Sequence, residues 1–450
     1  MLNSVKHNLK TKATKCIEDG TTTIHHEINN VKESINNIDQ RISHTVANLQ
    51  QEIHDLKQEL PNKQFVSPEY ILDTIKSNDS KKPRLLICGY YGARNLGDEL
   101  MLQAILKRID STKFDITILL ANHIEVDASI YAPYHVIHYP QYNDDILILA
   151  MNYDYIIWGG GAIIDDSWYS FYYSHSSLGY ILLKTSLAAL KSNKKVFVLG
   201  TSTNQTLEDS NFIRDLQTII LKANFFSLRD TNSLKTLQDS QIDIKKVNII
   251  DDIAISDLPT SLPKKQSKNL NIGLVFIFDD KNLKNITSFV KLITIYFSDK
   301  PVTLSFIPFF DHCNYDQKRF QEILSSINAP KNISINIKPF ANTMDELIQI
   351  FSQCDCIFSM RYHATLISSL CGIKTLSIDY GGEHRHYRNK LSYIKKHYND
   401  FEVIPSSSIT DKKLVFNAIE QTLTQTTHKI NTQAIKSANK TLSEIITLIN

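Results

Sequence analysis

Two residues at the start of an apolar helix give the clearest chemical signal in the chain. Arg361 and His363 stand two positions apart, where a buried strand is expected to turn into a helix. The first amides of a helix have no partner within the helix, so two cationic side chains beside them favour a bound anion. A structural interpretation is equally open, in which Arg361 pairs with a core carboxylate and His363 caps the helix.

A glycine-rich loop far upstream, GYYGARNLGDE at residues 89–99, is the second candidate. It leaves a predicted strand and enters a helix, and we expect Gly89, Gly92 and Gly97 to let a ligand approach the backbone. Gly92, Asn95 and Gly97 are the substrate-binding candidates of this loop. Asp98 has two open roles, in function or in stabilising the helix dipole. The loop matches neither the dinucleotide fingerprint nor the phosphate loop, so hydride transfer and NTP hydrolysis lack their required parts.

Two further segments end predicted strands with residues suited to a site. Gly160 and Gly161 follow the strand YDYIIW, and the missing side chains suggest room for a substrate. Arg229 ends the strand in FFSLRD, where a loop of a parallel sheet should face a ligand. We therefore expect Arg229 to be a second anion clamp, with Asp230 as its partner or as a helix cap.

Composition excludes several classes of protein. The chain has 450 residues with 49 Lys+Arg against 47 Asp+Glu, which gives nucleic-acid binding no support. We find no export signal and no apolar run of membrane length, so a cytoplasmic location is expected, with the inner face of the membrane as an option. Asp165, Asp166 and the six cysteines lack the further ligands of a metal site, so no metal is expected and the two aspartates are interpreted as solvated.

Alternating apolar runs and amphipathic helices predict an α/β protein with two doubly wound lobes. The first lobe is expected at residues 84–257. A polar linker at 258–270 leads to a second lobe at 271–410. Helices are expected over 411–450.

The N-terminal segment predicts self-association. Over residues 1–60 a weakly basic amphipathic helix leads into apolar residues spaced by threes and fours, which is the pattern of a coiled coil. A linker is expected at 61–83. We expect a homo-oligomer and, through the basic helix, peripheral membrane contact; a single long helix packed on the body is the alternative.

Taken in chain order, five motifs resemble the polysaccharide pyruvyl transferase family: GYYGARNLGDE, GGG after a strand, SLRD, IPFF before Asp311, and RYHATLISSLCGIKTLSIDY. The resemblance covers about residues 84–400. It implies a GT-B-like fold and transfer of the pyruvyl group of phosphoenolpyruvate onto sugar hydroxyls of a surface-polysaccharide precursor, lipid-linked or free, as a ketal with release of phosphate. It implies no cofactor, and it assigns Arg361 and His363 to the phosphate and carboxylate of the donor, with Arg229 matching the upstream arginine. With this resemblance, the lobe at 84–257 is expected to bind the acceptor and the lobe at 271–410 the donor.

Such a reaction needs an acid, a base and fixed cations. His363 is a candidate for the acid or for a phosphate clamp, and Asp98 for orienting or deprotonating the acceptor hydroxyl. The sequence leaves the general acid, the acceptor sugar and the ketal stereochemistry open.

One departure from the family supports an alternative. Glu383 stands about where some members carry a lysine, and Arg385, His386 and Arg388 are candidates to replace that charge. An acid here would also suit the ribose hydroxyls of a nucleotide sugar, so a GT-B-type glycosyltransferase is the runner-up. A noncatalytic assembly protein, in which the coiled coil is the function, is the third hypothesis.

Overall fold

The computed structural model describes only part of the chain. The predicted coiled coil, Glu383 and Arg385 lie outside the described residues, so their predictions stay open. The described residues are 81–120, 128–139, 143–167, 169, 178–203, 206–266, 269–279, 282–380, 386–426 and 428–450.

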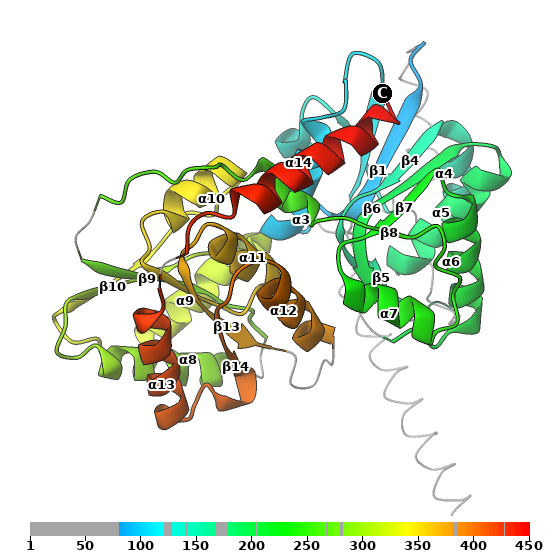
Figure 1. Cartoon of the computed structure of the whole chain (residues 1–450). Coiled ribbons are helices and arrows are strands. Elements are labelled where there is room, and N and C mark those ends of the chain that lie inside the picture. The colour runs from blue at the N-terminus through cyan, green and yellow to red at the C-terminus, as the bar shows by residue number, and fades with distance from the viewer. Residues whose placement is uncertain are drawn as a thin grey trace, which may run out of the picture. The chain divides into compact units, whose positions relative to one another are not determined.

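The first sheet is parallel and holds eight strands within the described residues, in the order β3-β2-β1-β4-β6-β7-β8, with β5 also paired to β6 (Figure 1). Because the order runs outward on both sides of β1, the lobe is doubly wound. The strands are β1 (Arg84–Tyr91), β2 (Asp115–Leu120), β3 (His135–His138), β4 (Tyr155–Trp158), β5 (Gly161–Ile164), β6 (Lys195–Thr203), β7 (Phe225–Leu228) and β8 (Asn248–Ile249).

Helices connect these parallel strands, as crossover connections require. Several begin at side-chain caps that the sequence supplies: Asp209 accepts from two amides of α6, and Asp230 accepts from an amide of α7. The helices are α3 (Leu96–Leu106), α4 (Asn143–Asn152), α5 (Leu178–Lys191), α6 (Ser210–Lys222) and α7 (Thr231–Asp239), with short 3-10 turns η1 (Ala128–Tyr131) and η3 (Ile253–Asp257).

The second sheet is parallel with the order β11-β10-β9-β12-β13-β14, so it too winds outward from one central strand. Its strands are β9 (Leu270–Val275), β10 (Val302–Phe306), β11 (Ile333–Ile337), β12 (Cys356–Ser359), β13 (Lys374–Asp379) and β14 (Glu402–Pro405). Its helices are α8 (Leu283–Tyr296), α9 (Tyr315–Ser325), α10 (Met344–Phe351), α11 (Tyr362–Leu370), α12 (His386–His397) and α13 (Lys412–Thr424), with turns η4 (His312–Asn314) and η5 (Ser406–Ser408). The prediction of two doubly wound lobes is confirmed.

The last helix, α14 (Thr432–Thr447), returns to the first lobe, where it packs against η3. In Figure 1 it is the red helix. The side chain of Asn450 bonds the backbone of Arg108 and Asp110, with distances of 3.2 Å in both cases. The chain therefore crosses between the lobes a second time at its C-terminal end.

Alternate residues of β1 enter different apolar cores. Leu86 and Cys88 pack with residues of α5 and α6, whereas Leu85 and Ile87 face α3 on the other side of the sheet. The core around Leu85 continues into the second lobe, where it includes residues of β9, α10 and α11. The two lobes therefore share one hydrophobic cluster on the sides where they meet.

Candidate functional site

The N-terminus of α11 lies at the carboxyl end of β12, the edge at which parallel sheets place their ligands. Arg361 is the N-cap residue, in an extended conformation, and its side chain makes no capping hydrogen bond. The first amides of α11 thus receive no side-chain cap from this residue, and they point toward a position that suits an anion.

The Arg361 side chain turns into the second lobe. Its Nε donates to the carbonyl of Phe276 at 3.0 Å, and its Nη2 lies 3.4 Å from Oδ1 of Asp316. Asp316 is fully buried and also accepts backbone amides of Phe309 and Phe310, at 2.9 and 2.8 Å. Burial raises the pKa of Asp316, and Arg361 offsets this in part. Arg361 therefore pairs with a core carboxylate, as its structural interpretation predicted.

His363 turns toward the first lobe instead. Its Nε2 lies 3.3 Å from Oδ2 of Asp252 and 3.4 Å from Nη1 of Arg229. Residues two positions apart on a helix do not face each other, because each step rotates by about 100°. For this reason the two side chains do not converge on one point: Arg361 pairs with Asp316 and His363 with Asp252. The N-cap residue is Arg361, so His363 is not the helix cap.

Asp252 links these groups, and sequence reasoning missed it. Its carboxylate is 1% exposed, accepts from Nη1 of Arg229 at 2.7 Å and from the amide of Ala254 at 3.0 Å. Burial alone would raise the pKa of Asp252, but His363 and Arg229 outweigh it, so the pKa lies below its ordinary value. Its sequence context, IIDDIAISD, carries no motif; a position directly after a strand was the one available signal.

Arg229 is only 3% exposed and joins both lobes. Its guanidinium stacks over the ring of Tyr362 at 4.3 Å, while Nη1 holds Asp252. The Nε of Arg229 is buried and has no hydrogen-bond partner among the described residues. An unpartnered buried donor is costly, so a ligand that accepts this hydrogen bond would be favoured.

The glycine-rich loop reaches the same place from the first lobe. A Cβ at Gly97 would lie 1.9 Å from Nδ1 of His363, so the glycine leaves room for the imidazole. Gly92 has a φ of 86°, and its amide donates to Oε1 of Glu99 at 2.9 Å. Tyr131 bonds the same carboxylate at 3.0 Å, which fixes the shape of the loop.

Asp98 lies beside this cluster. It is 7% exposed, and its Oδ1 is 3.0 Å from the position that a Cβ of Gly161 would take. Burial raises the pKa of Asp98 to about 7, although Arg229 and Lys390 lower it in part. Near neutral pH the group can therefore either give or take a proton.

The remaining predicted residues have backbone or packing contacts. Asn95 forms an antiparallel bridge with Phe310 of the second lobe, and Leu96 donates to the carbonyl of Phe309 at 2.9 Å. A Cβ at Gly160 would meet the sulfur of Met101 at 2.3 Å. The contacts of Asn95 and Leu96 hold the loop against the second lobe, whereas Met101 fills the space beside Gly160 within the first lobe. A substrate contact for Asn95 and Gly160 stays a prediction.

Lys390 of α12 is a second residue that sequence reasoning missed. It is 6% exposed, and its electrostatic neighbours include Arg229 and Asp98. It lies seven positions after Glu383, the position at which some family members carry a lysine. A comparison made at that position alone does not identify Lys390.

The interpretation of Asp166 as a solvated carboxylate is wrong. It is 7% exposed, and its Oδ2 accepts the amides of Glu208 and Asp209 at 2.5 and 2.7 Å. Two backbone donors replace the water that burial removes. Asp166 therefore fixes the segment before α6.

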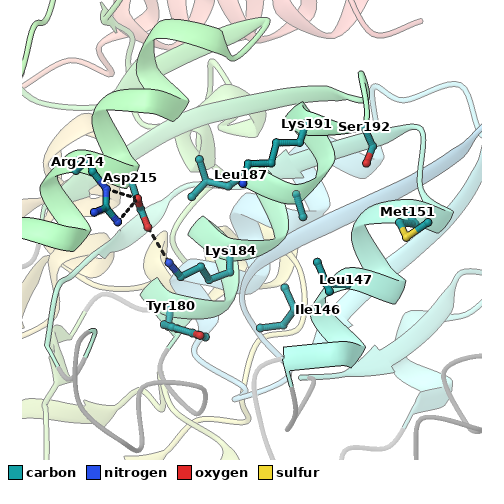
Figure 2. Close-up of a pocket in the computed structure, with 11 residues that line it drawn as sticks. Ile146, Leu147, Met151, Tyr180, Lys184, Leu187, Lys191, Ser192, Arg214 and Asp215 are labelled. Atoms are coloured by element: carbon teal, nitrogen blue, oxygen red, sulfur yellow. Dashed lines mark hydrogen bonds and ion pairs between the residues drawn. The ribbon is translucent and has the colours of Figure 1, made fainter.

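A hollow of about 520 Å³ lies away from these residues, between α4, α5 and α6 (Figure 2). Lys184 and Arg214 point toward Asp215 there, and none of the predicted site residues lines it. Separately, none of the helices in the described ranges is both long and apolar enough to cross a bilayer.

Comparisons with solved structures support the fold alone. A putative UDP-N-acetylglucosamine 2-epimerase from Listeria monocytogenes has 12% identity and a TM-score of 0.51, over 82% of this chain and 97% of its own. MurG from Acinetobacter baumannii has 12% identity and a TM-score of 0.50, over 81% and 99%. UGT89C1 from Arabidopsis thaliana has 10% identity and a TM-score of 0.50, over 82% and 100%. The fold is GT-B-like, as the sequence predicted.

The sequence comparisons are more specific. No curated protein matches the chain. The family model described as polysaccharide pyruvyl transferase matches residues 95–382, more than half of the chain. The match begins within the glycine-rich loop, at Asn95, and includes Arg229, Arg361 and His363. This chain, with its two parallel α/β lobes and the cluster where they meet, belongs to the polysaccharide pyruvyl transferase family and is a transferase.

Proposed function

We propose that this protein transfers the pyruvyl group of phosphoenolpyruvate onto two hydroxyls of a sugar in a surface-polysaccharide precursor. The product is a cyclic pyruvate ketal, and inorganic phosphate is released. The transfer needs no metal or other cofactor in this proposal. Family membership supports a pyruvate donor and a saccharide acceptor.

The observation that carries the proposal is the meeting of Arg229 and His363 beside the uncapped end of α11. Arg229 comes from the first lobe and His363 from the second, and their facing nitrogens are 3.4 Å apart. Phosphoenolpyruvate carries a phosphate and a carboxylate, so it needs several cationic donors at short range. The Nε of Arg229, which has no hydrogen-bond partner in the described part of the chain, and the amides of α11 offer further donors for such an anion.

The reaction balances without an external reagent. The methylene carbon of the donor gains one proton, the bond from its central carbon to the phosphate oxygen breaks, and two sugar oxygens bond to that carbon. The two hydroxyls lose two protons; one equals the proton added to the methylene and the other leaves with phosphate. The site must therefore both supply and receive protons.

We assign the donor to Arg361, Arg229 and His363 and the acceptor side to Asp98. Asp98 has a pKa of about 7 through burial, so its ionised form is available to take a hydroxyl proton near neutral pH. His363 faces Asp252, and with a proton on Nε2 its ring donates to that carboxylate. When the ring also carries a proton on Nδ1, it is a cation that can hold phosphate or give that proton to the methylene carbon.

The test is phosphate release from phosphoenolpyruvate with a panel of sugar precursors, with NMR detection of a ketal methyl group in the product. Release that requires both substrates, together with the new methyl signal, supports the proposal. Calorimetric binding of UDP or GDP, with no release of phosphate from phosphoenolpyruvate, would instead favour a nucleotide-sugar glycosyltransferase.

A further inference from the structure

Asp316 lies beside Arg361 and has more contacts than its place in a helix requires. It is the second residue of α9, and its side chain is 1% exposed. An acidic residue in the first turn of a helix commonly lies at the surface, where it interacts with the helix dipole. A buried carboxylate has lost its water, so it needs donors for its oxygens.

The two oxygens of Asp316 have different partners. Oδ2 accepts the amides of Phe309 and Phe310, at 2.9 and 2.8 Å, and the amide of Asp316 donates to the carbonyl of Phe310 at 3.2 Å. These three hydrogen bonds fix the carboxylate against the segment that follows β10. Oδ1 lies 3.4 Å from Nη2 of Arg361. The turn before α9 therefore uses one oxygen, and Arg361 uses the other.

The guanidinium of Arg361 is held along one edge. Nε donates to the carbonyl of Phe276 at 3.0 Å, and Nη2, on the same edge, faces Asp316. The Cζ atom lies 5.7 Å from the ring centroid of Phe310, which packs against the group. Nη1 has no hydrogen-bond partner within the described ranges, and the side chain is 14% exposed. The Nη1 end is therefore available to a ligand.

We propose that Asp316 is a positioning residue that orients Arg361 for the donor. Because Nε and Nη2 are bound along one edge, the guanidinium keeps its Nη1 end for an anion. The inference rests on the proposed function and deepens it, since the anion is the phosphate or the carboxylate of phosphoenolpyruvate. Asp316 acts through Arg361 and does not touch the donor.

Charge alone would give Asp316 the opposite effect. A carboxylate beside Arg361 reduces the attraction of this cation for a second anion, so removal of the negative charge would strengthen donor binding. Orientation predicts weaker binding instead. An arginine that is not held in place must lose its rotational freedom when the donor binds. The sign of the change in affinity therefore distinguishes the two effects.

The first test is calorimetric titration of phosphoenolpyruvate into variants of the full chain. Asp316→Asn keeps an oxygen for the amides of Phe309 and Phe310 and removes the charge beside Arg361. We expect about tenfold weaker binding. Asp311→Asn is the matched control, because Asp311 lies in the same segment and pairs with a different arginine, Arg94, at 2.9 Å. It should bind the donor as the wild type does.

Unchanged or tighter binding in Asp316→Asn would overturn the inference. Equal weakening in Asp311→Asn would overturn it too, because the effect would then pass through the contact between the lobes. If Asp316→Asn does not fold, Arg361→Lys decides. A lysine keeps the charge but has no edge of donors, so binding should fall, and wild-type affinity would contradict the role of orientation.

Steady-state kinetics of phosphate release separates positioning from a loss of folded protein. We expect Asp316→Asn to raise KM for phosphoenolpyruvate and to leave kcat nearly unchanged, since Arg361 binds the donor before and during the reaction. A lower kcat at unchanged KM is the result expected from a smaller amount of correctly folded enzyme. It would show a merely structural role and overturn the inference.

The orientation of Arg361 can also be measured without a donor. In ¹⁵N NMR of the arginine side chains, Arg361→Lys identifies the signal of Arg361 by its loss. Rotation about the Nε–Cζ bond should be slow in the wild type and in Asp311→Asn, and faster in Asp316→Asn. Equal rates in the wild type and Asp316→Asn would overturn the inference. Absence of phosphoenolpyruvate binding to the wild type would defeat the proposed function and leave this rotation measurable.

Discussion

Two aspartates of this protein each hold two cationic side chains, and the two clusters differ in ways that matter for function. Asp252 holds Arg229 and His363, which are 3% and 11% exposed and come from different lobes. Asp215 holds Lys184 and Arg214, which are 33% and 66% exposed and lie on neighbouring helices of one lobe (Figure 2).

An aspartate with two basic side chains thus forms ion pairs with solvent-exposed partners in one place and a candidate site in the other. Solvent screens the charges around Asp215, so its cations gain little from a new anion. The cations around Asp252 are buried and lie next to the N-terminus of α11. They include the Nε of Arg229, which no group of the described ranges partners. The Asp252 cluster therefore differs from the Asp215 cluster because its cations are buried and come from two lobes, not because it carries charges.

The largest difference is expected when the arginines are compared. Arg229→Met leaves Asp252 without its closest partner and should cost about 3–5 kcal/mol of unfolding free energy. Arg214→Met should cost less than about 1 kcal/mol, since the Arg214 side chain is mostly exposed and Asp215 keeps Lys184 as a partner. Urea unfolding of both variants measures the contrast. Equal losses of unfolding free energy in Arg229→Met and Arg214→Met would contradict the distinction between the two clusters.

A smaller effect is expected at the contact between Gly97 and His363. The methyl group of Gly97→Ala would meet the imidazole, so His363 must move. A misplacement of about 1 Å can cost about 100-fold in rate. We expect a fall in kcat for phosphate release with the chain still folded by circular dichroism. An unchanged kcat would show that the position of His363 does not matter.

Asp252 and Asp215 should also contribute differently to the free energy of unfolding at low pH. The pKa of Asp252 is lower in the folded protein than in the unfolded chain, so its carboxylate stabilises the fold above the unfolded value of about 4. This stabilisation is lost as the pH falls toward the folded value. Asp252→Asn should therefore flatten the acid part of the stability curve, and Asp215→Asn should flatten it less. Similar curves for both variants would contradict the comparison.

The smallest effect is expected at Lys184. Lys184→Met removes one partly exposed partner of Asp215, and we expect a loss below about 1 kcal/mol. Phosphate release should stay at the wild-type rate because Lys184 lies in the hollow of α4, α5 and α6. A clear loss of rate would extend the functional region to that hollow.

The sequence predicted much of the fold because its strands are short apolar runs that alternate with helices. It also identified Arg229 and His363, since both lie where a strand ends and a helix begins. It could not predict the link between them. Asp252 lies 111 positions before His363, and no local pattern relates the two.

Two other features depend on packing that a sequence does not show. The burial of Lys390 follows from contacts of α12 with α7 and α11, and the burial of Asp166 follows from two amides more than 40 residues away. The separation of Arg361 from His363 could have been expected, because helical residues two apart point to different sides.

The central claim is that the cations at the meeting of the two lobes bind phosphoenolpyruvate. Titration calorimetry of phosphoenolpyruvate into the wild-type protein, Arg361→Ala and the matched control Arg214→Ala tests it directly. We predict binding to the wild type and to Arg214→Ala, and loss of binding in Arg361→Ala. Absence of binding to the wild type, or equal binding to all three proteins, would contradict the account.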